Sequence, residues 1–333
     1  MRQDIGEKLT WILMYSLCSS SMLVVNKLAV AAVPLPTLIA GAQLVSSAIV
    51  PMVLQGLGFR VIARMTQKRI IPYVFYTMMF AAGLFANMKA LLLTNVGAVI
   101  AARCCLPVIV SLIEFFFMGR SFPNKRSQMS LLGVVLFAYL YVQQDSGVAV
   151  EGSEGFMWLF IWWLLLALQM TYGKWMTSNI EMTQWERVFY TNAFAIPPNV
   201  VIWYFSADSS YENAHIMEHL DSYQKNMLIL SCIIGCAISY SGWRCRSCVT
   251  ATTFTLVGVV NKMATIAFTM VVWPKETTLM KVSALVFCVL FGLLYQEAPM
   301  KKGKMNGGLN SSGGNIILGA NLEEKNAMLS AKV

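Results

Sequence analysis

The chain has 333 residues, of which 57% are hydrophobic and only 12% are charged. An ordinary soluble domain, with about 45–50% apolar and about 25% charged residues, is excluded by this composition. The 25 Lys and Arg outnumber the 16 Asp and Glu, giving a formal charge of +9, but these cations are spread among connecting segments. No basic face interleaved with aromatic residues is present, so the sequence predicts a membrane protein that binds no nucleic acid.

Apolar stretches long enough to cross a bilayer, about 20 residues each, follow one another along the chain. Ten spans are expected, at 9–31, 35–57, 70–94, 96–118, 128–144, 155–177, 184–206, 226–244, 249–273 and 278–297. Helices are expected because backbone groups in lipid must bond within their own segment, and no stretch alternates as a membrane barrel strand does. The sequence therefore predicts an all-α polytopic protein with an N-terminus at 1–8, a ten-helix domain at 9–297 and a flexible tail at 298–333.

Lys and Arg mark every second connection between the expected spans. One side of the membrane receives Arg2, Lys8, Arg60, Arg64, Lys68, Arg69, Arg120, Lys125, Arg126, Lys174, Arg187, Arg244, Arg246 and the tail. The other side receives Lys225 and Lys275 and an acidic stretch at 208–221. By the positive-inside rule both termini are cytosolic and the number of helices is even.

Two short motifs raise the question of metal or redox chemistry. Cys245-Arg246-Ser247-Cys248 is a lone C-x-x-C without a second pair, and the other cysteines are scattered through the spans. His215-Ile216-Met217-Glu218-His219 fits H-x-x-E-H, but it lies in an acidic loop and has no evident third ligand. We expect no catalytic residue, no metal and no cofactor. A polytopic membrane enzyme, built on the histidine loop, is kept as an alternative.

Ionisable and amide side chains inside the expected spans are more informative. Lys262 lies near the middle of its apolar run, where a cation costs roughly 3 kcal/mol or more unless it faces the protein interior. It therefore indicates a pathway for an anion. For Lys27 two roles are equally open: its side chain links neighbouring helices, or it is a cation that lines a cavity. The others are Asn26, Lys89, Arg103, Glu114, Asn192, Asn199 and Lys281; we expect Glu114 and Lys281 to reach the interface, and Lys89 and Arg103 to tie neighbouring helices.

A short internal echo favours a transporter. Val96-Gly97-Ala98-Val99 in the fourth span resembles Val257-Gly258-Val259-Val260 in the ninth. Copies displaced by five helices run in opposite senses across the membrane, which predicts an inverted 5+5 repeat with a substrate site near the midplane.

Two further segments carry a resemblance to a known family. They are Ile238 to Trp243 followed by Thr250 to Lys262, and Phe189-Tyr190-Thr191-Asn192. Over nearly the whole chain the sequence resembles the nucleotide-sugar transporters of the drug/metabolite transporter superfamily, most of all those that carry GDP-sugars. Their G-A-L-N-K motif is matched at Gly258, Asn261 and Lys262, and their F-Y-N-N motif at Phe189 to Asn192. The resemblance implies the drug/metabolite transporter fold.

The resemblance also implies roles for individual side chains. Asn192 would match a guanine edge, and Tyr190 would stack or donate to it. Gly258 would let the ligand approach the backbone, Asn261 would bind sugar hydroxyls, and Lys262 would bind phosphate, with Ser239 facing the same region. The chain departs from the family pattern at Thr191, where an asparagine is expected, and at Phe254, where tyrosine is common, so selectivity for GDP over UDP stays open.

The implied activity is exchange of a cytosolic GDP-sugar, GDP-mannose or GDP-fucose, for GMP across the Golgi or ER membrane by alternating access. The expected partners are the GDP-sugar, GMP and membrane lipid, and a homodimer is left open. A UDP-sugar or phosphorylated-metabolite carrier of the same superfamily is the alternative within transport.

Overall fold

The computed structural model describes residues 2–59, 62, 66–94, 96–145, 152–205, 220–272 and 278–301. Within these ranges the chain is helical, apart from an isolated bridge between Arg120 and Met300. The described helices are α1 (Arg2–Ala32), α2 (Pro36–Gly56), α3 (Gln67–Leu93), α4 (Val96–Phe117), α5 (Lys125–Asp145), α6 (Gly152–Asn179), α7 (Gln184–Phe205), α9 (Ser222–Cys248), α10 (Ala251–Val272) and α11 (Leu279–Leu293). Each of the ten expected spans corresponds to one of these helices.

Local sequence explains several helix boundaries. Pro36 begins α2, where the N–H that proline lacks would have no partner within the helix. Asp221 begins α9 with a capping box: its side chain accepts from the Gln224 N–H at 2.7 Å, and the Gln224 side chain accepts from the Asp221 N–H at 3.0 Å. The Thr278 hydroxyl caps α11 by accepting from the Lys281 N–H at 3.4 Å.

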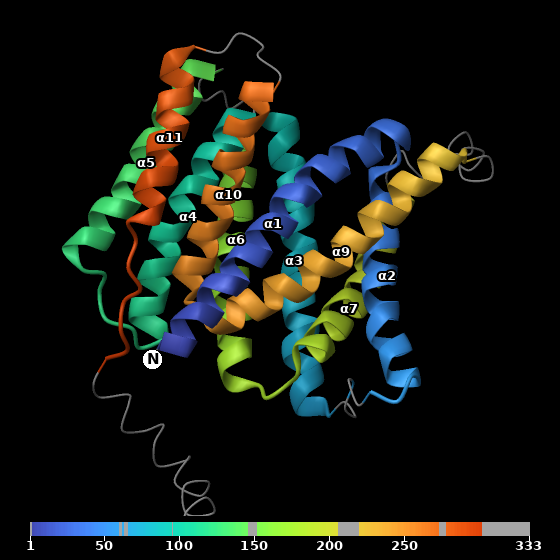
Figure 1. Ribbon diagram of the computed structural model, residues 1–333. Coiled ribbons are helices and arrows are strands. Elements are labelled where there is room, and N and C mark those ends of the chain that lie inside the picture. The colour runs from blue at the N-terminus through green and yellow to red at the C-terminus, as the bar shows by residue number, and fades with distance from the viewer. Residues whose placement is uncertain are drawn as a thin grey trace, which may run out of the picture.

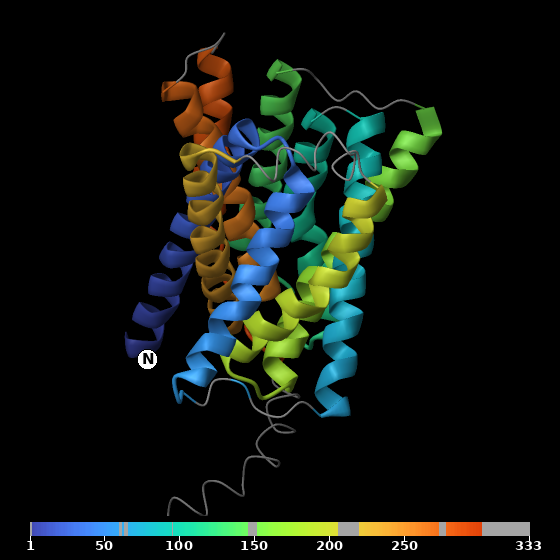
Figure 2. The same cartoon turned by 90° about the vertical axis from the view of Figure 1, so that its right-hand side faces the viewer.

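The helices form one bundle in which successive elements run in opposite directions (Figures 1 and 2). The most extensive packing joins α1 to α9, α3 to α6, α5 to α11 and α2 to α7. The N-terminal residues and the segment after α11 meet at one end of the bundle, where Lys8 Nζ lies 3.4 Å from a Glu297 carboxylate oxygen. An even number of crossings requires this arrangement of the two termini.

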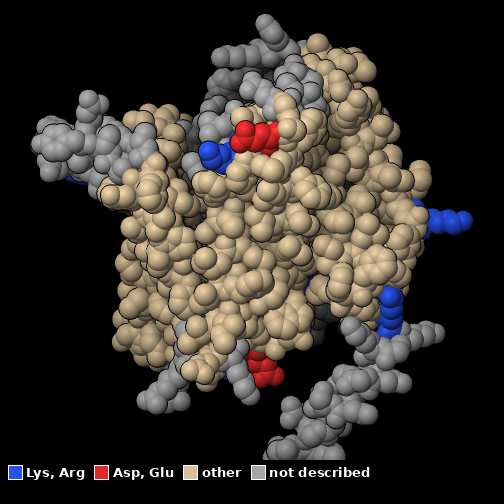
Figure 3. Space-filling view, turned by 180° about the vertical axis from the view of Figure 1, so that it is seen from behind, with Lys and Arg blue, Asp and Glu red and all other residues tan. Residues whose placement is uncertain are grey.

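The outer surface of the bundle is apolar. Six described helices are long and apolar enough to cross a membrane, namely α1, α2, α3, α4, α6 and α9. Many large hydrophobic side chains point outward, including Phe116, Phe117, Ile71 and Phe205. In Figure 3 uncharged residues cover the middle of one face, and charged residues appear near its margins. This architecture is that of a polytopic membrane protein.

Two buried clusters hold the bundle together. One cluster, formed by α4, α5, α10 and α11, includes Cys104, Val134, Leu256 and Leu285. The other, formed by α3, α6, α7 and α9, is rich in aromatic rings and includes Tyr73, Tyr76, Tyr190 and Trp243. The second cluster forms the floor of the cavity described next.

Candidate functional site

A cavity of about 500 Å³ lies among α1, α2, α3, α6, α7 and α9. This volume falls in the usual range of small-molecule sites, about 300–1,000 Å³. Its wall is mostly apolar, with a limited set of groups able to form hydrogen bonds: Gln43, Ser47, Tyr76, Thr77, Gln169, Thr191, Asn192, Asn199 and Ser239. Amide and hydroxyl groups spaced along an apolar wall suit a flat heterocycle that carries both donors and acceptors.

Three of the predicted site residues lie on this wall: Thr191, Asn192 and Ser239. Asn192 is 6% exposed, and its Nδ2 donates to the Val188 carbonyl at 2.7 Å and to Ser239 Oγ at 3.4 Å. These contacts fix the amide while its oxygen accepts no hydrogen bond from the described residues. The buried Thr191 hydroxyl has no partner within the described part of the chain.

Arg246, which the sequence assigns only to a cytosolic connection, contacts two residues that line the cavity, Tyr76 and Met170. Its side chain is buried, and its Nη1 donates to the hydroxyl of Tyr76, a lining residue, at 2.9 Å. The guanidinium carbon also lies over the rings of Trp243 at 5.1 Å and Phe254 at 4.6 Å. Within the described residues no carboxylate pairs with it, and its Nε has no hydrogen-bond partner. No sequence motif reveals Arg246, because its burial depends on contacts with α3 and α6, which are distant in sequence.

Tyr190 contributes to this floor and does not line the cavity. It is buried among Tyr73, Phe189 and Phe194, with ring centroids 6.2, 5.0 and 6.1 Å away. Its prediction as a group that stacks on the base therefore has no support in this conformation.

A second group of predicted residues lies on α10. Lys262 is half-buried and forms no hydrogen bond or ion pair with any described residue. Arg103 belongs to α4, which packs against α10. The Arg103 guanidinium lies over the Trp162 ring of α6 at 5.4 Å and likewise has no described carboxylate partner. Two cations without described acidic partners thus lie on neighbouring helices of an apolar bundle, an arrangement that favours binding of an anion.

The other predicted residues of α10 share one helix face. Phe254 stacks on Tyr15 of α1 with ring centroids 4.9 Å apart, and the Thr265 hydroxyl lies 3.1 Å from Ser20 Oγ, also in α1. Gly258 lies between these contacts, and no atom lies within 4 Å of where its side chain would begin. Asn261 is 8% exposed, and its Nδ2 has no partner among the described residues. This face of α10 therefore offers open space beside unused polar groups.

The predicted residues therefore form two neighbouring groups instead of one. Both groups border α1 and α6: Met22 and Met170 line the cavity, while Ser20 and Trp162 contact the α10 and α4 side. Ser239 lies with Asn192 in the cavity, not beside Gly258. Of Lys27 only the backbone is described, in α1; the neighbouring Asn26 accepts from Gln43 Nε2 at 2.9 Å.

One interpretation of an intramembrane charge is wrong. Glu114 does not reach the membrane interface, because it is 3% exposed and its carboxylate accepts hydrogen bonds from the first residues of α10. Arg103 of α4 does link neighbouring helices, but through a cation–π contact with the Trp162 ring of α6.

The metal and redox motifs gain no support. Cys245 and Cys248 are free thiols, and among the described residues no group of three or more His, Cys, Asp and Glu could hold a metal. The His215 to His219 motif and the tail from 302 onward lie outside the described residues.

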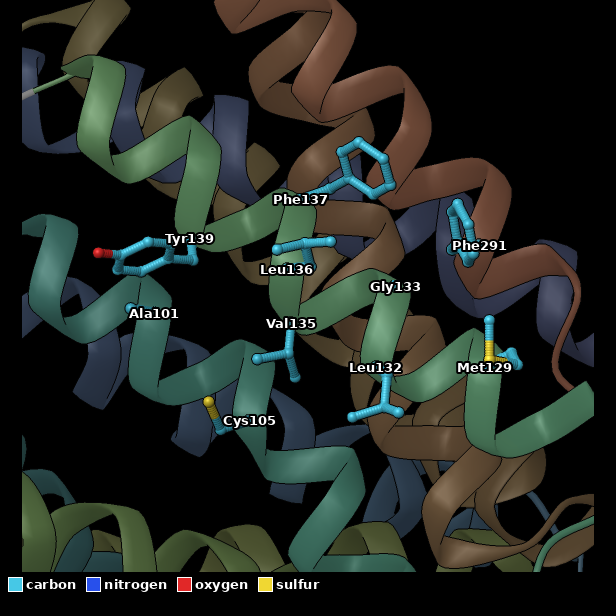
Figure 4. A pocket seen from close by; sticks show the side chains of 10 residues that line it. All are labelled: Ala101, Cys105, Met129, Leu132, Gly133, Val135, Leu136, Phe137, Tyr139 and Phe291. Atoms are coloured by element: carbon cyan, nitrogen blue, oxygen red, sulfur yellow. The ribbon is translucent and has the colours of Figure 1, made fainter. Parts of the chain in front are cut away.

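A second hollow, of about 550 Å³, lies on the outside of α4, α5 and α11 (Figure 4). Its lining consists of hydrocarbon and sulfur side chains and one tyrosine, including Met129, Leu132, Leu136 and Tyr139. It holds no charged or amide group that could bind a nucleotide, so the candidate site is the first cavity together with the cation pair.

Comparisons with known proteins find homologues over most of the chain. No protein-family model matches the chain. "GDP-fucose transporter 1" of Arabidopsis thaliana is 27% identical over 307 residues, covering 89% of this chain and 88% of the relative. "GDP-mannose transporter GONST3" of the same plant is 28% identical over 299 residues, covering 86% and 77%. A "GDP-mannose transporter" of Kluyveromyces lactis is 24% identical over 204 residues, covering 59% and 61%.

A solved crystal structure superposes on 88% of this chain and 96% of its own length, with a TM-score of 0.62 and 13% sequence identity. This likeness shows a shared fold. The relatives are named as transporters, which supports the prediction that the chain is not an enzyme. The chain is a homologue of named GDP-sugar transporters over most of its length, and these matches support its assignment to the nucleotide-sugar transporter family.

Proposed function

We propose that the chain exchanges a cytosolic GDP-sugar, GDP-mannose or GDP-fucose, for luminal GMP across a Golgi or ER membrane. The names of the relatives support the substrate class. The observation that carries the proposal is the presence of Arg103 and Lys262 on the packed helices α4 and α10, two cations without described acidic partners inside an apolar bundle. A diphosphate supplies the missing negative charge and accepts several charge-assisted hydrogen bonds.

The two groups of the site bind different parts of this ligand. The guanine base enters the cavity, where the free oxygen of Asn192 accepts from the base and the hydroxyls of Thr191 and Ser239 offer further hydrogen bonds. The diphosphate lies toward Arg103 and Lys262. Asn261, whose Nδ2 has no described partner, donates to a sugar hydroxyl beside the open space at Gly258.

Exchange follows from the same charges. An empty site leaves two neighbouring cations unpaired in a medium of low dielectric, which opposes reorientation of the empty carrier. Bound GDP-sugar or GMP neutralises them, so the loaded carrier reorients faster. The two five-helix halves then rock about the site and expose it to the cytosol and the lumen in turn, with both termini on the cytosolic side.

Purified protein in liposomes tests the proposal. Liposomes preloaded with GMP should take up labelled GDP-mannose or GDP-fucose faster than liposomes preloaded with UMP or left empty. Lys262→Ala should abolish uptake, while Lys225→Ala, which removes an exposed cation of α9, should leave it unchanged. Undiminished uptake by Lys262→Ala would overturn the assignment of the anion site.

One observation favours a second carrier function. Thr191 replaces an amide that could read guanine, and its hydroxyl is unused. A UDP-sugar carrier would show the opposite preference in the same liposomes, with UMP driving uptake and GMP failing to do so.

A further inference from the structure

The two cations of the anion site stand on different helices, and a single buried carboxylate joins those helices at one end. Glu114 belongs to α4, and its Oε1 accepts from the Ala251 N–H of α10 at 2.9 Å. Its Oε2 accepts from the Thr252 N–H at 3.1 Å and from the Thr252 hydroxyl at 2.5 Å. The acid on α4 thus satisfies backbone donors in the first turn of α10 that have no partner within that helix.

Both cations lie at the same distance from this junction. Arg103 precedes Glu114 by eleven residues in α4, and Lys262 follows Ala251 by eleven residues in α10. Three helical turns span about 11 residues and rise roughly 16 Å, so each cation lies on the same helix face as its end of the junction. Because α4 and α10 run side by side from that end (Figure 1), Arg103 and Lys262 reach the same depth.

The cations themselves do little to hold this alignment. Lys262 has no hydrogen bond to any described residue, and the described contact of Arg103 is the Trp162 ring. Because they are like charges at one depth of two packed helices, their repulsion favours separation of α4 and α10 when no anion is present. Alignment therefore depends on contacts elsewhere along α4 and α10, of which the Glu114 junction is the polar and directional one.

We propose that Glu114 is a positioning residue for substrate binding: it fixes the register of α4 against α10 at which Arg103 and Lys262 face one diphosphate. The inference rests on the proposed function. A positioning residue differs from a merely structural cap in its effect on binding. A cap that only stabilised α10 would change the affinity for all ligands of the folded protein alike.

Three probes separate these roles in the full-length purified protein: GDP, guanosine and pyrophosphate. Glu114→Ala should raise the Kd of GDP and of pyrophosphate at least about tenfold, the factor equivalent to about 1.4 kcal/mol, while the Kd of guanosine stays unchanged. Glu114→Gln keeps one acceptor oxygen and the side-chain shape, so it should recover part of the loss. The readout is isothermal titration calorimetry.

Glu297→Ala is the matched control. Glu297 also accepts from the start of α10, from the Thr250 N–H at 3.0 Å, but it belongs to the segment after α11 and not to α4. Its loss should leave the Kd values of all three probes unchanged. If Glu114→Ala does not fold, Glu114→Gln alone is measured: it should still weaken binding of GDP and pyrophosphate and leave the Kd of guanosine unchanged.

The possible failures are distinct. Wild-type protein that binds no GDP would overturn the proposed function together with this proposal. Wild-type protein that binds GDP, with Glu114 variants that bind all three probes normally or weaken guanosine equally, would overturn the positioning role alone.

Discussion

At the residue scale the buried arginine beneath the cavity is the least expected feature. The sequence places Arg246 among cytosolic cations, yet the structure buries it against Tyr76, Trp243 and Phe254. Aromatic faces and a tyrosine hydroxyl compensate part of the cost of removing a guanidinium from water. Arginine is suited to such a place because its planar group stacks and donates at once, whereas lysine offers only a point charge.

Packing around this guanidinium leaves no room for a methyl group at Gly173. A side-chain carbon at that position of α6 would overlap Arg246 Nη1. Gly173→Ala should therefore displace Arg246 from Tyr76 and lower the free energy of unfolding by about 1–3 kcal/mol. A fall in melting temperature measures it, and the fall should shrink in an Arg246→Ala background, where the obstacle is gone.

Gly83→Ala is the control for that substitution. Its new methyl group would meet Leu165 at an ordinary 3.8 Å, so the melting temperature should stay near the wild-type value. Equal destabilisation by Gly173→Ala and Gly83→Ala would contradict the role of Arg246, because alanine favours the helix more than glycine does and neither fall could come from helix propensity.

The predicted base contact of Asn192 can be separated from phosphate binding. Asn192→Ala removes a side-chain amide from the cavity wall. In the described structure this amide is held in place by the Val188 carbonyl and by Ser239. The Kd of guanosine should rise about tenfold, equivalent to loss of one or two hydrogen bonds, while the Kd of pyrophosphate stays unchanged. An equal rise for pyrophosphate would contradict the division of the site.

At the element scale the helices were predictable because apolar runs and the polar residues that separate them determine helices locally. Each expected span lies on one observed helix, since an apolar run between polar breaks has no alternative in lipid. The differences are at the ends: α1 extends back to Arg2, and α5 begins at Lys125 instead of 128. These polar turns find partners in the fold, as when Glu7 pairs with Arg244 of α9 and Lys8 with Glu297.

Contacts between elements were beyond the sequence. Which helix covers Glu114 or Arg246 depends on tertiary packing. For this reason the sequence predicts an interfacial position for Glu114, whereas the structure buries it as a cap of α10. The motif around Gly258 predicts that its residues share one face of α10, because residues three or four apart share a face, and the role of that face in binding stays a prediction. The partner cation Arg103 required knowledge that α4 lies beside α10.

Two glycines at the α10 region test the role of that face. No atom lies within 4 Å of a side chain at Gly258, whereas a methyl group at Gly292 of α11 would overlap Val260 of α10. Gly258→Leu should leave the melting temperature close to wild type and abolish GDP-sugar uptake, because its side chain fills the space assigned to the ligand. Gly292→Ala should lower the melting temperature by overpacking.

An additional control is Gly56, which also has no atom nearby but lies at the end of α2, away from the cavity. Gly56→Leu should leave uptake unchanged. Uptake that survives Gly258→Leu would remove the open face of α10 from the proposed pathway.

At the scale of the whole molecule, the predicted inverted repeat gains support from the packing, although it stays a prediction. If each helix of the first half corresponds to the helix five spans later, the packing of α1 on α9 maps onto that of α6 on α3, and α4 on α5 maps onto α10 on α11. The helix pairs α2 with α7, α4 with α10 and α5 with α11 map onto themselves. The sequence similarity between residues 96–99 and 257–260 is less informative, since Val96 is the first residue of α4 while Val257 lies well inside α10.

Side-chain contacts join helices at the end of the bundle predicted to face the cytosol. Arg246 binds Tyr76 beside the cavity, and the Glu7 and Arg244 side chains join α1 to α9 across the two halves. Alternating access requires this end to open for a cytosolic substrate to enter. The contact between α1 and α9 must therefore loosen in each cycle.

A cross-link between Glu7→Cys and Arg244→Cys tests this requirement. The eight native cysteines are first replaced, and a short cleavable thiol linker then joins the two exposed positions. Cross-linked protein should bind GDP added from the luminal side but lose exchange, and cleavage of the linker should restore exchange. Each single-cysteine variant treated with the same reagent should transport normally. Exchange at the wild-type rate in the cross-linked protein would mean that the α1 and α9 ends stay together throughout the cycle, and the substrate would then need an entry other than the floor at Arg246.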